Sequence, residues 1–375
     1  MSITIKEVQT KSELKKFILF PFKIFKGNKY WIPPLIMDEV KTLSKEKNPA
    51  FDFCEAKYWL AYKDGKIVGR IAGIINHKYN EKWKQNFARF GWVDFIDDKE
   101  VSKKLFDELK KWAKEKGKTN IHGPLGFTDF DGEGLLIEGF DELSTFGSIY
   151  NFPYYKEHIE SLGFEKDADW VEFLVKFDPN VSGPEKVSRI ADAVAERNQL
   201  HMLKVKKAKE MLPYARNIFY LINDAYKDLF GFVELTDKQI DMYVKAYFGF
   251  IKPDYVPVIL DKNNKVAAFG ITMPSLSLAV QKSKGKLFPF GFIHILRAMK
   301  NNPNVDLYLT AVRPELQNKG VNAMLINEMH KVFVRNKIKN VETNRELEEN
   351  AKIQAQWRFY ESRQHKRRRC YKKSI

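Results

Sequence analysis

Residues 311–325 of the chain read AVRPELQNKGVNAML, and the meaning of the second half depends on this stretch. Ala311 and Val312 end a strand-like run, and an apolar helical stripe begins at Val321. A helix that starts in this way is usually capped by Ser, Thr, Asp or Asn, because that side chain accepts a hydrogen bond from a free N–H group of the first turn. A basic, amide-rich loop around Gln317 and Gly320 replaces the cap. The sequence therefore predicts a helix whose first N–H groups are left for a ligand.

The composition is that of a two-domain globular protein. The chain has 375 residues and is 44% hydrophobic, and single cores rarely grow past ~250–300 residues. No run approaches the ~20 uncharged apolar residues of a membrane-spanning helix. The N-terminus lacks the apolar region of a secretory signal, which favours a cytoplasmic location. Cys54 and Cys370 are far apart and in no metal-ligand spacing, so we expect neither a disulfide scaffold nor a metal site.

The formal net charge of +16 is the compositional feature that points to a partner. A basic surface attracts phosphates, anionic cofactors or nucleic acid through long-range electrostatics. The densest basic run, Lys366–Lys373, stands at the end of the chain, and its alternation would place Arg367 and Arg369 on one strand face and Arg368 and Cys370 on the other. Solvated surface, an anionic ligand and a nucleic-acid platform all remain open at this point.

The order of predicted elements in the first half is repeated in the second. The first half predicts strands at 3–8, 58–62, 67–75, 90–96, 119–122 and 170–177 and helices at 12–25, 33–43, 101–112 and 154–164. After the Pro- and Gly-containing stretch 178–186, a strand at 202–208, a helix at 212–226, a hairpin at 256–272, a strand at 305–312, a helix at 321–333, a strand at 341–347 and a helical stretch at 350–360 follow. Residues 60–74 align with 258–272, an offset of 198 residues, and the second half adds an insertion at 276–303. We therefore predict a duplication with domains 1–178 and 179–375.

With its strand, Val-x-Pro, Gln-x-x-Gly and helix in that order, the second half resembles the GNAT acyl-CoA N-acyltransferase superfamily. Residues 317–322 match the acyl-CoA signature Gln/Arg-x-x-Gly-x-Gly/Ala at all but the last position, where Asn322 stands. The resemblance implies an α/β (α+β) fold of two tandem acyl-CoA N-acyltransferase-like domains, each a mixed, mostly antiparallel sheet flanked by helices. It also implies acetyl-CoA or another acyl-CoA as cofactor.

The cofactor-binding candidates lie at the end of the strand and the start of the helix. A pyrophosphate placed at a helix N-terminus gains hydrogen bonds and a favourable field, and a glycine there lets the backbone come close. The resemblance adds strand backbone as an oxyanion site and an Asn that starts a later helix. The expected residues are Ala311, Val312, Arg313, Gln317, Asn318, Lys319, Gly320, Val321, Asn322 and Asn350.

The first half lacks such a loop. Asp97, Asp98 and Glu100 stand where its helix begins, and carboxylates at that end would repel a pyrophosphate. We therefore expect the first copy to bind no CoA and to be a degenerate partner domain.

The catalytic residues are less defined by the sequence. In the family, a Tyr after the fifth strand often protonates the leaving thiolate, and Tyr360 is the candidate here. The alternative is that Trp357, Phe359 and Tyr360 are aromatic residues of the core. Tyr308, expected to share a strand face with Thr310, is a second candidate. The loop that follows His122 carries Asp129, Asp131 and Glu133, which could contact a substrate amine.

The sequence thus predicts direct transfer of an acyl group, expected to be acetyl, from CoA to a primary amine on a small molecule or peptide. It predicts no metal and no membrane partner. One alternative is an aminoacyl or long-chain acyl transferase, in which Phe288, Phe290 and Phe292 line a wider pocket. The other is a non-catalytic, basic RNA-binding or scaffold protein.

Overall fold

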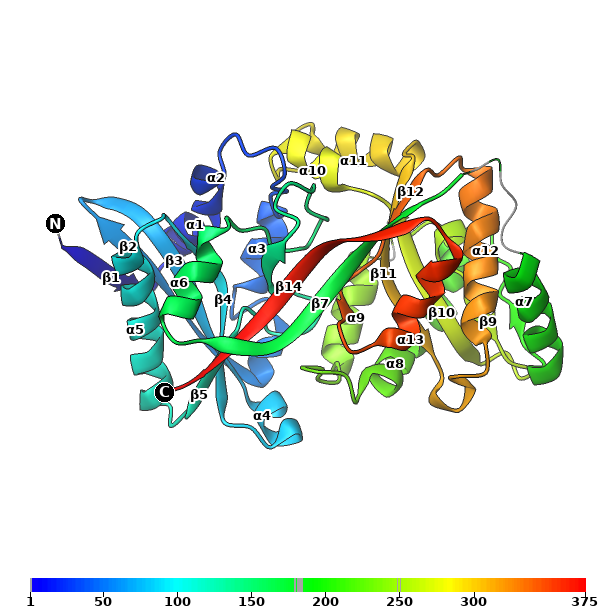
Figure 1. Cartoon of the computed structure of the whole chain (residues 1–375), viewed down its shortest axis with the longest axis horizontal. Coiled ribbons are helices and arrows are strands. Elements are labelled where there is room, and N and C mark those ends of the chain that lie inside the picture. Colours follow the sequence, from blue (N-terminus) through cyan, green and yellow to red (C-terminus); the bar gives the residue numbers. More distant parts are fainter. Residues whose placement is uncertain (1, 179, 181–184, 248, 250) are drawn as a thin grey trace.

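The computed structural model describes residues 2–178, 180, 185–247, 249 and 251–375. Its strands form one long mixed sheet in the order β1-β2-β3-β4-β5-β14-β7-β12-β11-β10-β9-β8. Figure 1 shows two halves, each a sheet covered by helices, joined in the middle by the two long strands β7 and β14. The α/β class with a mostly antiparallel sheet in each half is confirmed.

In the first copy, a hairpin and a strand precede the main helix. Its elements are β1 (Ile3–Glu7), α1 (Lys11–Leu19), α2 (Pro21–Ile24), α3 (Ile36–Thr42), the 3₁₀ turn η1 (Pro49–Asp52), β2 (Cys54–Lys63), β3 (Lys66–Asn76), α4 (His77–Trp83), β4 (Phe87–Phe95), α5 (Lys99–Glu115), β5 (Asn120–Gly123), β6 (Leu135–Glu138), α6 (Tyr154–Ser161) and β7 (Glu165–Lys176). The predicted elements of this half lie within a few residues of these bounds, but the predicted helix at 12–25 is divided into α1 and α2, and α4 and β6 were not predicted.

The second copy repeats that order. Its elements are α7 (Glu185–Asn198), β8 (His201–Met202), η2 (Ala208–Met211), α8 (Leu212–Tyr226), α9 (Asp237–Tyr247), η3 (Pro253–Tyr255), β9 (Val258–Leu260), β10 (Val266–Pro274), α10 (Ser277–Ser283), α11 (Gly291–Lys300), β11 (Asn304–Val312), η4 (Pro314–Leu316), α12 (Val321–Arg335), β12 (Asn340–Glu342), β13 (Glu346–Leu347), α13 (Ala351–Gln354), η5 (Ala355–Phe359) and β14 (Ser362–Ser374). The series β9-β10-β11-α12-β12 matches β2-β3-β4-α5-β5, including a parallel last pair in each copy.

Two strand predictions in the second half are wrong in extent. The predicted strand at 202–208 is limited to the two residues of β8, because the chain then turns into η2. The predicted strand at 341–347 is divided into β12 and β13. The Asn344 side chain lies at this break and donates a hydrogen bond of 2.6 Å to the Tyr308 carbonyl oxygen, so the chain departs from regular pairing where β11 and β12 separate.

The two halves exchange their last strands. β14, from the end of the chain, lies between β5 and β7 and pairs with β5 through residues 371–374. The end of β7, in turn, pairs with β12 of the second copy at Leu174–Lys176. Each half therefore needs a strand from the other to complete its sheet, which fixes the halves relative to one another (Figure 1).

The basic end of the chain is an internal strand. Arg368 and Cys370 are buried on one face, while Arg367 and Arg369 are half-buried on the other, as the alternation predicts. Asp169 pairs with both Arg367 and Arg369, and Glu172 pairs with Arg368. These arginines are neutralised by carboxylates of β7 and are not a free nucleic-acid arm.

Each copy has a β-bulge in one long strand, β4 in the first copy and β11 in the second. The register between β10 and β11 shifts so that Tyr308 is the extra residue, and the register between β3 and β4 shifts around Trp92. A bulge reverses the alternation of side chains beyond it. Leu307 accordingly packs on the side of α12, and Leu309 packs on the side of α8. The expectation that Tyr308 and Thr310 share a face is wrong for this reason, since Tyr308 points with Asp306, toward which its hydroxyl donates over 3.4 Å.

Candidate functional site

The site is the wedge where β11 and β12 separate. The two parallel strands pair only at Asn304–Asp306 with Asn340–Glu342, and β11 then continues to Val312 paired with β10 alone. Beyond the paired residues, one edge of β11 is free of a neighbouring strand, as a ligand that binds by backbone hydrogen bonds requires. The predicted residues Tyr308, Ala311 and Val312 all lie on this part of β11.

Helix α12 begins beside this edge without a cap from a side chain. Its N-cap is Gly320, at φ 81°, and no side chain of the described residues accepts a hydrogen bond from its first turn. The left-handed backbone is a conformation that glycine adopts without strain. Gln317, Asn318, Lys319 and Asn322 are all exposed around this helix end. The uncapped start that the sequence predicted is thus present in the structure.

The predicted cofactor residues Arg313, Asn318 and Asn350 have intramolecular partners. Arg313 forms ion pairs with Asp261 at 2.8 Å and with Glu315 at 3.0 Å, so its charge is already neutralised. Asn318 accepts a hydrogen bond from Lys352 at 3.2 Å. Asn350 is the N-cap of α13, where its side chain accepts from the Ile353 N–H. Their roles toward a cofactor remain predictions.

The free edge of β11 is covered by side chains. The Tyr226 hydroxyl donates to the Thr310 carbonyl oxygen at 2.9 Å and accepts from the Thr310 N–H at 3.3 Å. The Gln317 amide donates to the Val312 carbonyl oxygen at 3.1 Å. The Tyr226 hydroxyl thus forms the same two hydrogen bonds that a secondary amide forms with one residue at a strand edge, one as donor and one as acceptor. Tyr226 was not predicted as a site residue from the sequence. Its position at the end of α8 was predicted, but only the packing of α8 on β11 brings it to the edge.

The Tyr360 side chain lies on the α12 side of the wedge. It lines an apolar pocket of about 30 Å³ together with Leu307, His330, Val341 and Trp357. Burial raises the pKa of Tyr360 to about 12, so its hydroxyl keeps its proton at neutral pH and can donate it. Of the aromatics in the alternative prediction, Trp357 is buried, but Phe359 is 48% exposed and is not a core residue.

The loop after β5 brings three carboxylates from the first copy to the second. Arg345 donates to the Asp131 carbonyl oxygen at 3.4 Å and lies 3.5 Å from the Glu133 carboxylate. Arg345 directly follows Asn344, the residue hydrogen-bonded to Tyr308, so this loop reaches the wedge. The ring of Phe130 also packs against Tyr243 of α9, with centroids 5.0 Å apart.

Asp129 is the member of this loop best suited to accept a proton. Burial, and then the negative charge of Glu133, raise the pKa of Asp129 to about 7. Burial likewise raises the pKa of Asp131 to about 6. Among the described residues, no side chain donates a hydrogen bond to the Asp129 carboxylate, whereas Asp131 accepts from the Phe127 and Thr128 N–H groups. A carboxylate with a pKa near 7 is matched to general base catalysis at neutral pH.

A second polar cluster fills the root of the wedge. Lys366 is buried between two carboxylates, hydrogen-bonded to Glu342 and 3.8 Å from Glu172. Although burial opposes it, Lys366 lowers the pKa of Glu342 to about 2. Burial and the Glu342 charge raise the pKa of Asp306 to about 8. The Lys366 ammonium therefore already pairs with Glu342 and Glu172, and its charge is neutralised within the cluster.

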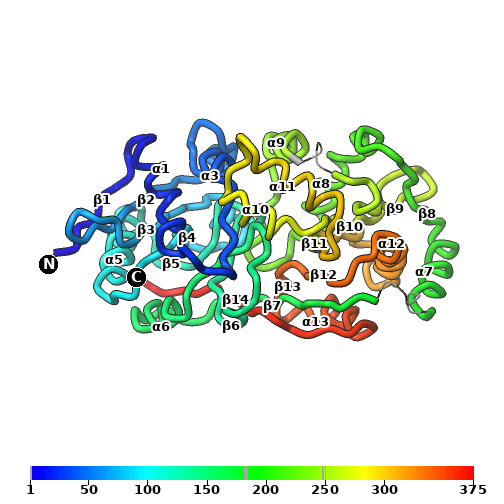
Figure 2. Tube along the Cα trace, turned by 90° about the horizontal axis from the view of Figure 1, so that it is seen from above, coloured from blue at the N-terminus to red at the C-terminus, as the bar shows by residue number. Residues whose placement is uncertain are grey.

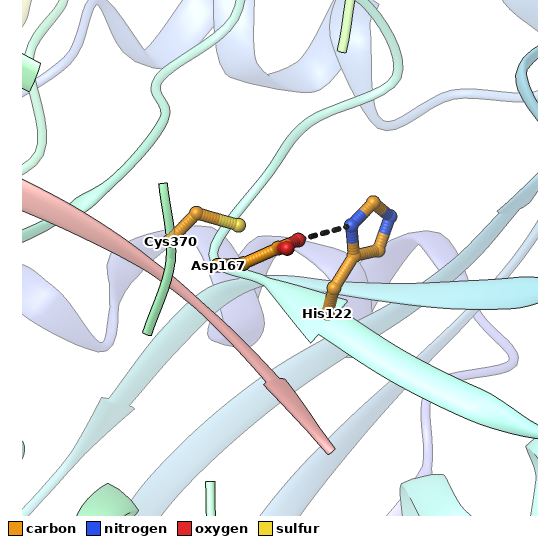
Figure 3. A group of neighbouring side chains, drawn as sticks. All are labelled: His122, Asp167 and Cys370. Carbon is orange, nitrogen blue, oxygen red and sulfur yellow. Dashed lines mark ion pairs between the residues drawn. The ribbon is translucent and has the colours of Figure 1, made fainter. Parts of the chain in front are cut away.

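A further group of neighbouring side chains consists of His122, Asp167 and Cys370 (Figure 3). The spacing in the sequence did not predict it, because Cys370 lies on the exchanged strand β14. The His122 Nδ1 atom lies 3.5 Å from the Asp167 carboxylate, and the possible ligand atoms of the three residues lie within 4.8 Å of one another. Burial lowers the pKa of His122 to about 4. Lys372 lies 3.4 Å from Asp167, and the positive charge of Arg89 acts on both His122 and Cys370. These positive charges disfavour a cation in this group.

The comparisons with solved structures identify the architecture. The fold of the whole chain is similar to a tandem GNAT protein from the clavulanic acid biosynthesis pathway, with a TM-score of 0.57 and 12% identity over 100% of this chain and 98% of that one. The chain has a tandem GNAT-like fold. A GCN5-related N-acetyltransferase from Sphaerobacter thermophilus is also similar, with a TM-score of 0.53 and 9% identity over 99% of this chain and 95% of that one.

Two curated proteins are similar in sequence to this tandem GNAT-like chain. Protein YghO of Escherichia coli is 29% identical over 371 residues, which cover 97% of this chain and 94% of YghO. A bacterial ceramide synthase of Caulobacter vibrioides is 27% identical over 303 residues, or 80% of this chain and 77% of the synthase. No family model matches the chain. No helix among the described residues is long and apolar enough to cross a membrane.

Proposed function

We propose that the protein is an acyl-CoA-dependent N-acyltransferase that uses the wedge of its second GNAT-like copy. The observation that carries the proposal is the start of α12 at Gly320, where no described side chain caps the helix beside the free edge of β11. The pyrophosphate of CoA would accept hydrogen bonds from the first N–H groups of α12, with Lys319 and Asn322 exposed beside it.

The acyl thioester would then follow the edge of β11. Thr310 offers an N–H and a carbonyl oxygen there, and the Tyr226 hydroxyl that now bonds both would rotate away to admit an amide of the pantetheine arm. Backbone N–H groups of β11 would stabilise the oxyanion of the tetrahedral intermediate. The pocket beside Tyr360 is about 30 Å³, so an acyl chain bound there requires side chains to move apart.

The acceptor amine would bind at the carboxylates of the loop after β5. Asp129, Asp131 and Glu133 lie in the field of Arg89 and Arg345, and Arg368 also acts on Glu133. Asp129 forms no ion pair with another described residue, which favours it as the contact for an ammonium group. Asp129 would remove a proton from that ammonium, and the neutral amine would attack the thioester carbonyl carbon. The C–S bond then breaks, and Tyr360 would donate its proton to the departing thiolate. The extra proton that the nitrogen still carries after the attack would leave to solvent, from which the Tyr360 phenolate regains its proton.

The relative in Caulobacter vibrioides favours a lipid amine as acceptor. A ceramide is the amide of a fatty acid and a long-chain amino alcohol, so its synthesis is an N-acylation. Long-chain acyl-CoA and a long-chain amine are therefore the second candidate pair, besides acetyl-CoA and a small or peptide amine.

Calorimetry with acetyl-CoA and palmitoyl-CoA tests the proposal. We expect Gly320→Glu to weaken acyl-CoA binding by at least about 100-fold, because it places a carboxylate at the phosphate site and removes charge-assisted hydrogen bonds of about 1.5–3 kcal/mol each. Gly117→Glu, at the far end of α5, is the control for a side chain at positive φ. A side chain at Gly320 also comes within 3.2 Å of Val194, so the melting temperature of Gly320→Glu is measured as a separate control for this contact. Equal affinities of both variants and the wild type would refute the proposal, as would binding of RNA with no effect of either CoA ester.

A further inference from the structure

The insertion in the second copy forms a helical hairpin, α10–α11, that lies across both halves. In Figure 1 it forms the upper edge of the molecule, and in Figure 2, seen from above, it crosses the middle. The Gln281 amide donates to the Trp31 carbonyl oxygen at 3.0 Å, and the Ile36 N–H donates to the Gly285 carbonyl oxygen at 3.0 Å. The hairpin is thus anchored to the first copy as well as to its own.

The inner face of the hairpin already has its apolar partners. Val280, Ile295 and Met299 are buried in a cluster with Ile32 of the first copy and Leu276. The exposed apolar side chains of the hairpin are therefore not needed to hold it in place.

The outer face carries large apolar side chains in water. Phe288 is 68% exposed, Phe290 71%, Leu278 52% and Leu296 58%. The rings of Phe288 and Phe292 lie 6.1 Å apart, and Leu296 follows Phe292 by one helical turn, so these three side chains form a continuous apolar ridge. The prediction that Phe288, Phe290 and Phe292 line a substrate pocket is wrong, because all three are exposed at the surface. Ridges of this kind on a protein surface commonly mark an interaction site.

Positive charge surrounds this ridge. Lys282, Lys284, Lys286, Arg297 and Lys300 are exposed, and residues 275–300 contain no Asp or Glu. None of these five side chains forms an ion pair with another residue that the structure describes. Free cations beside exposed Phe and Leu side chains are the composition of a helix that lies in a membrane interface, where the apolar residues enter the acyl region and the cations meet anionic headgroups.

We propose that the outer face of α10–α11 docks the protein onto an anionic lipid bilayer. The proposal is independent of the N-acyltransferase reaction and departs from the sequence-based expectation of no membrane partner. A single-stranded nucleic acid is the less favourable occupant, because its bases stack on aromatic rings but leave Leu278 and Leu296 in water. A bilayer covers the Phe and Leu side chains together.

Flotation with vesicles of phosphatidylcholine, with and without phosphatidylglycerol, tests the docking. We expect the wild type to float with the anionic vesicles at low salt and less with the neutral ones. The double variant Phe288→Ser/Phe290→Ser should bind at least about tenfold more weakly, because both aromatic rings lose their burial in the acyl region. Leu212→Ser/Phe359→Ser is the matched control, since these side chains are 49% and 48% exposed away from the hairpin.

The charges are tested separately. Lys282→Glu/Lys284→Glu/Lys286→Glu should abolish the preference for anionic vesicles, and a melting temperature like that of the wild type shows that each variant is folded. Equal flotation of the wild type and the Phe variant would overturn the proposal. The proposal would also be overturned if the wild type did not bind anionic vesicles but bound a single-stranded RNA. A dimer that forms in the wild type and is lost in the Phe variant would overturn it as well.

Discussion

The helices α5 and α12 are equivalent in the two copies, but their N-termini are capped differently. In the first copy, the Asp98 side chain caps α5 by accepting from the Glu100 N–H at 2.9 Å, and Lys63 pairs with the same carboxylate at 2.8 Å. In the second copy, Gly320 starts α12 without a side-chain cap among the described residues. One fold therefore presents one helix end that is filled by its own chain and one that is open to a ligand.

The strand edges differ in the same way. In the first copy, the chain after β5 folds back so that the Leu125 N–H donates to the Phe90 carbonyl oxygen at 2.8 Å. In the second copy, the edge of β11 is bonded by the Asn344, Tyr226 and Gln317 side chains. A side chain can rotate away at the cost of a hydrogen bond, whereas the backbone bond of the first copy opens only if a whole segment moves. The first copy is thus closed, and it contributes its Asp129 loop to the wedge of the second.

The largest expected effect concerns this contribution of the first copy. We expect Asp129→Asn to lower kcat by about 10²-fold or more, the usual worth of a general base, while acyl-CoA affinity stays unchanged. Steady-state rates of CoA release with an accepted amine, together with calorimetry, separate the two quantities. Asp107→Asn on the exposed face of α5 is the control. A normal rate in Asp129→Asn would mean that the first copy does not take part in the chemistry.

Removal of the cap on α5 tests whether the closed helix end is structural. We expect Asp98→Ala to destabilise the protein by about 1 kcal/mol, because an orphan N–H group loses its acceptor. Acyl-CoA affinity should not change, and the milder Asp98→Asn should have a weak effect on both. The urea midpoint and calorimetry give the two values. A large loss of CoA affinity in either variant would place the cofactor in the first copy instead.

The pH dependence of the rate probes the carboxylates between the copies. With Asp129 as general base and a pKa of about 7, the rate should rise with pH through about 7. The Glu133 charge contributes to this raised pKa, so Glu133→Gln should move the midpoint of the pH–rate profile to lower pH. A midpoint that stays in place, or moves upward, would show that another group controls the rate.

The stability of the wedge should also depend on pH. The pKa of Asp306 is raised to about 8 in the folded protein, above its usual value near 4, so the folded state holds a proton that the unfolded state loses between these values. Stability contributed by this group is full below pH 4 and is lost as the pH rises toward 8. Asp306→Asn should therefore flatten the fall in melting temperature between pH 6 and 8. An unchanged slope would contradict the protonated state of Asp306.

The smallest effect is expected at the edge of β11. Tyr226→Phe removes the hydroxyl that bonds both backbone groups of Thr310, so we expect acyl-CoA to bind a few-fold more tightly, while stability falls by about 1 kcal/mol. Tyr220→Phe, on the exposed face of α8, is the control. Weaker binding in Tyr226→Phe would instead make the hydroxyl a ligand of the cofactor.

Local patterns in the sequence predicted the repeat and the long helices α5, α8 and α12, but not the helices α4, α7, α9, α10 and α11. The stripe of Val101, Leu105, Leu109 and Trp112 predicted α5, and all four side chains are buried. The Asp64-Gly65 pair predicted the β2–β3 turn, where both residues have positive φ. The bulge at Tyr308 was not predicted, because an extra residue in one strand is defined only against its partner β10.

The sequence by itself determined the duplicated order of elements, the uncapped start of α12 and the alternating faces of β14, because each depends on residues close together in the chain. Tertiary structure alone decided that β14 completes the sheet of the first copy, that the Asp129 loop reaches the wedge of the second, and that Tyr226 covers the edge of β11. These arrangements join residues far apart in the chain, and no local periodicity encodes which distant partner a strand edge or a buried charge will find.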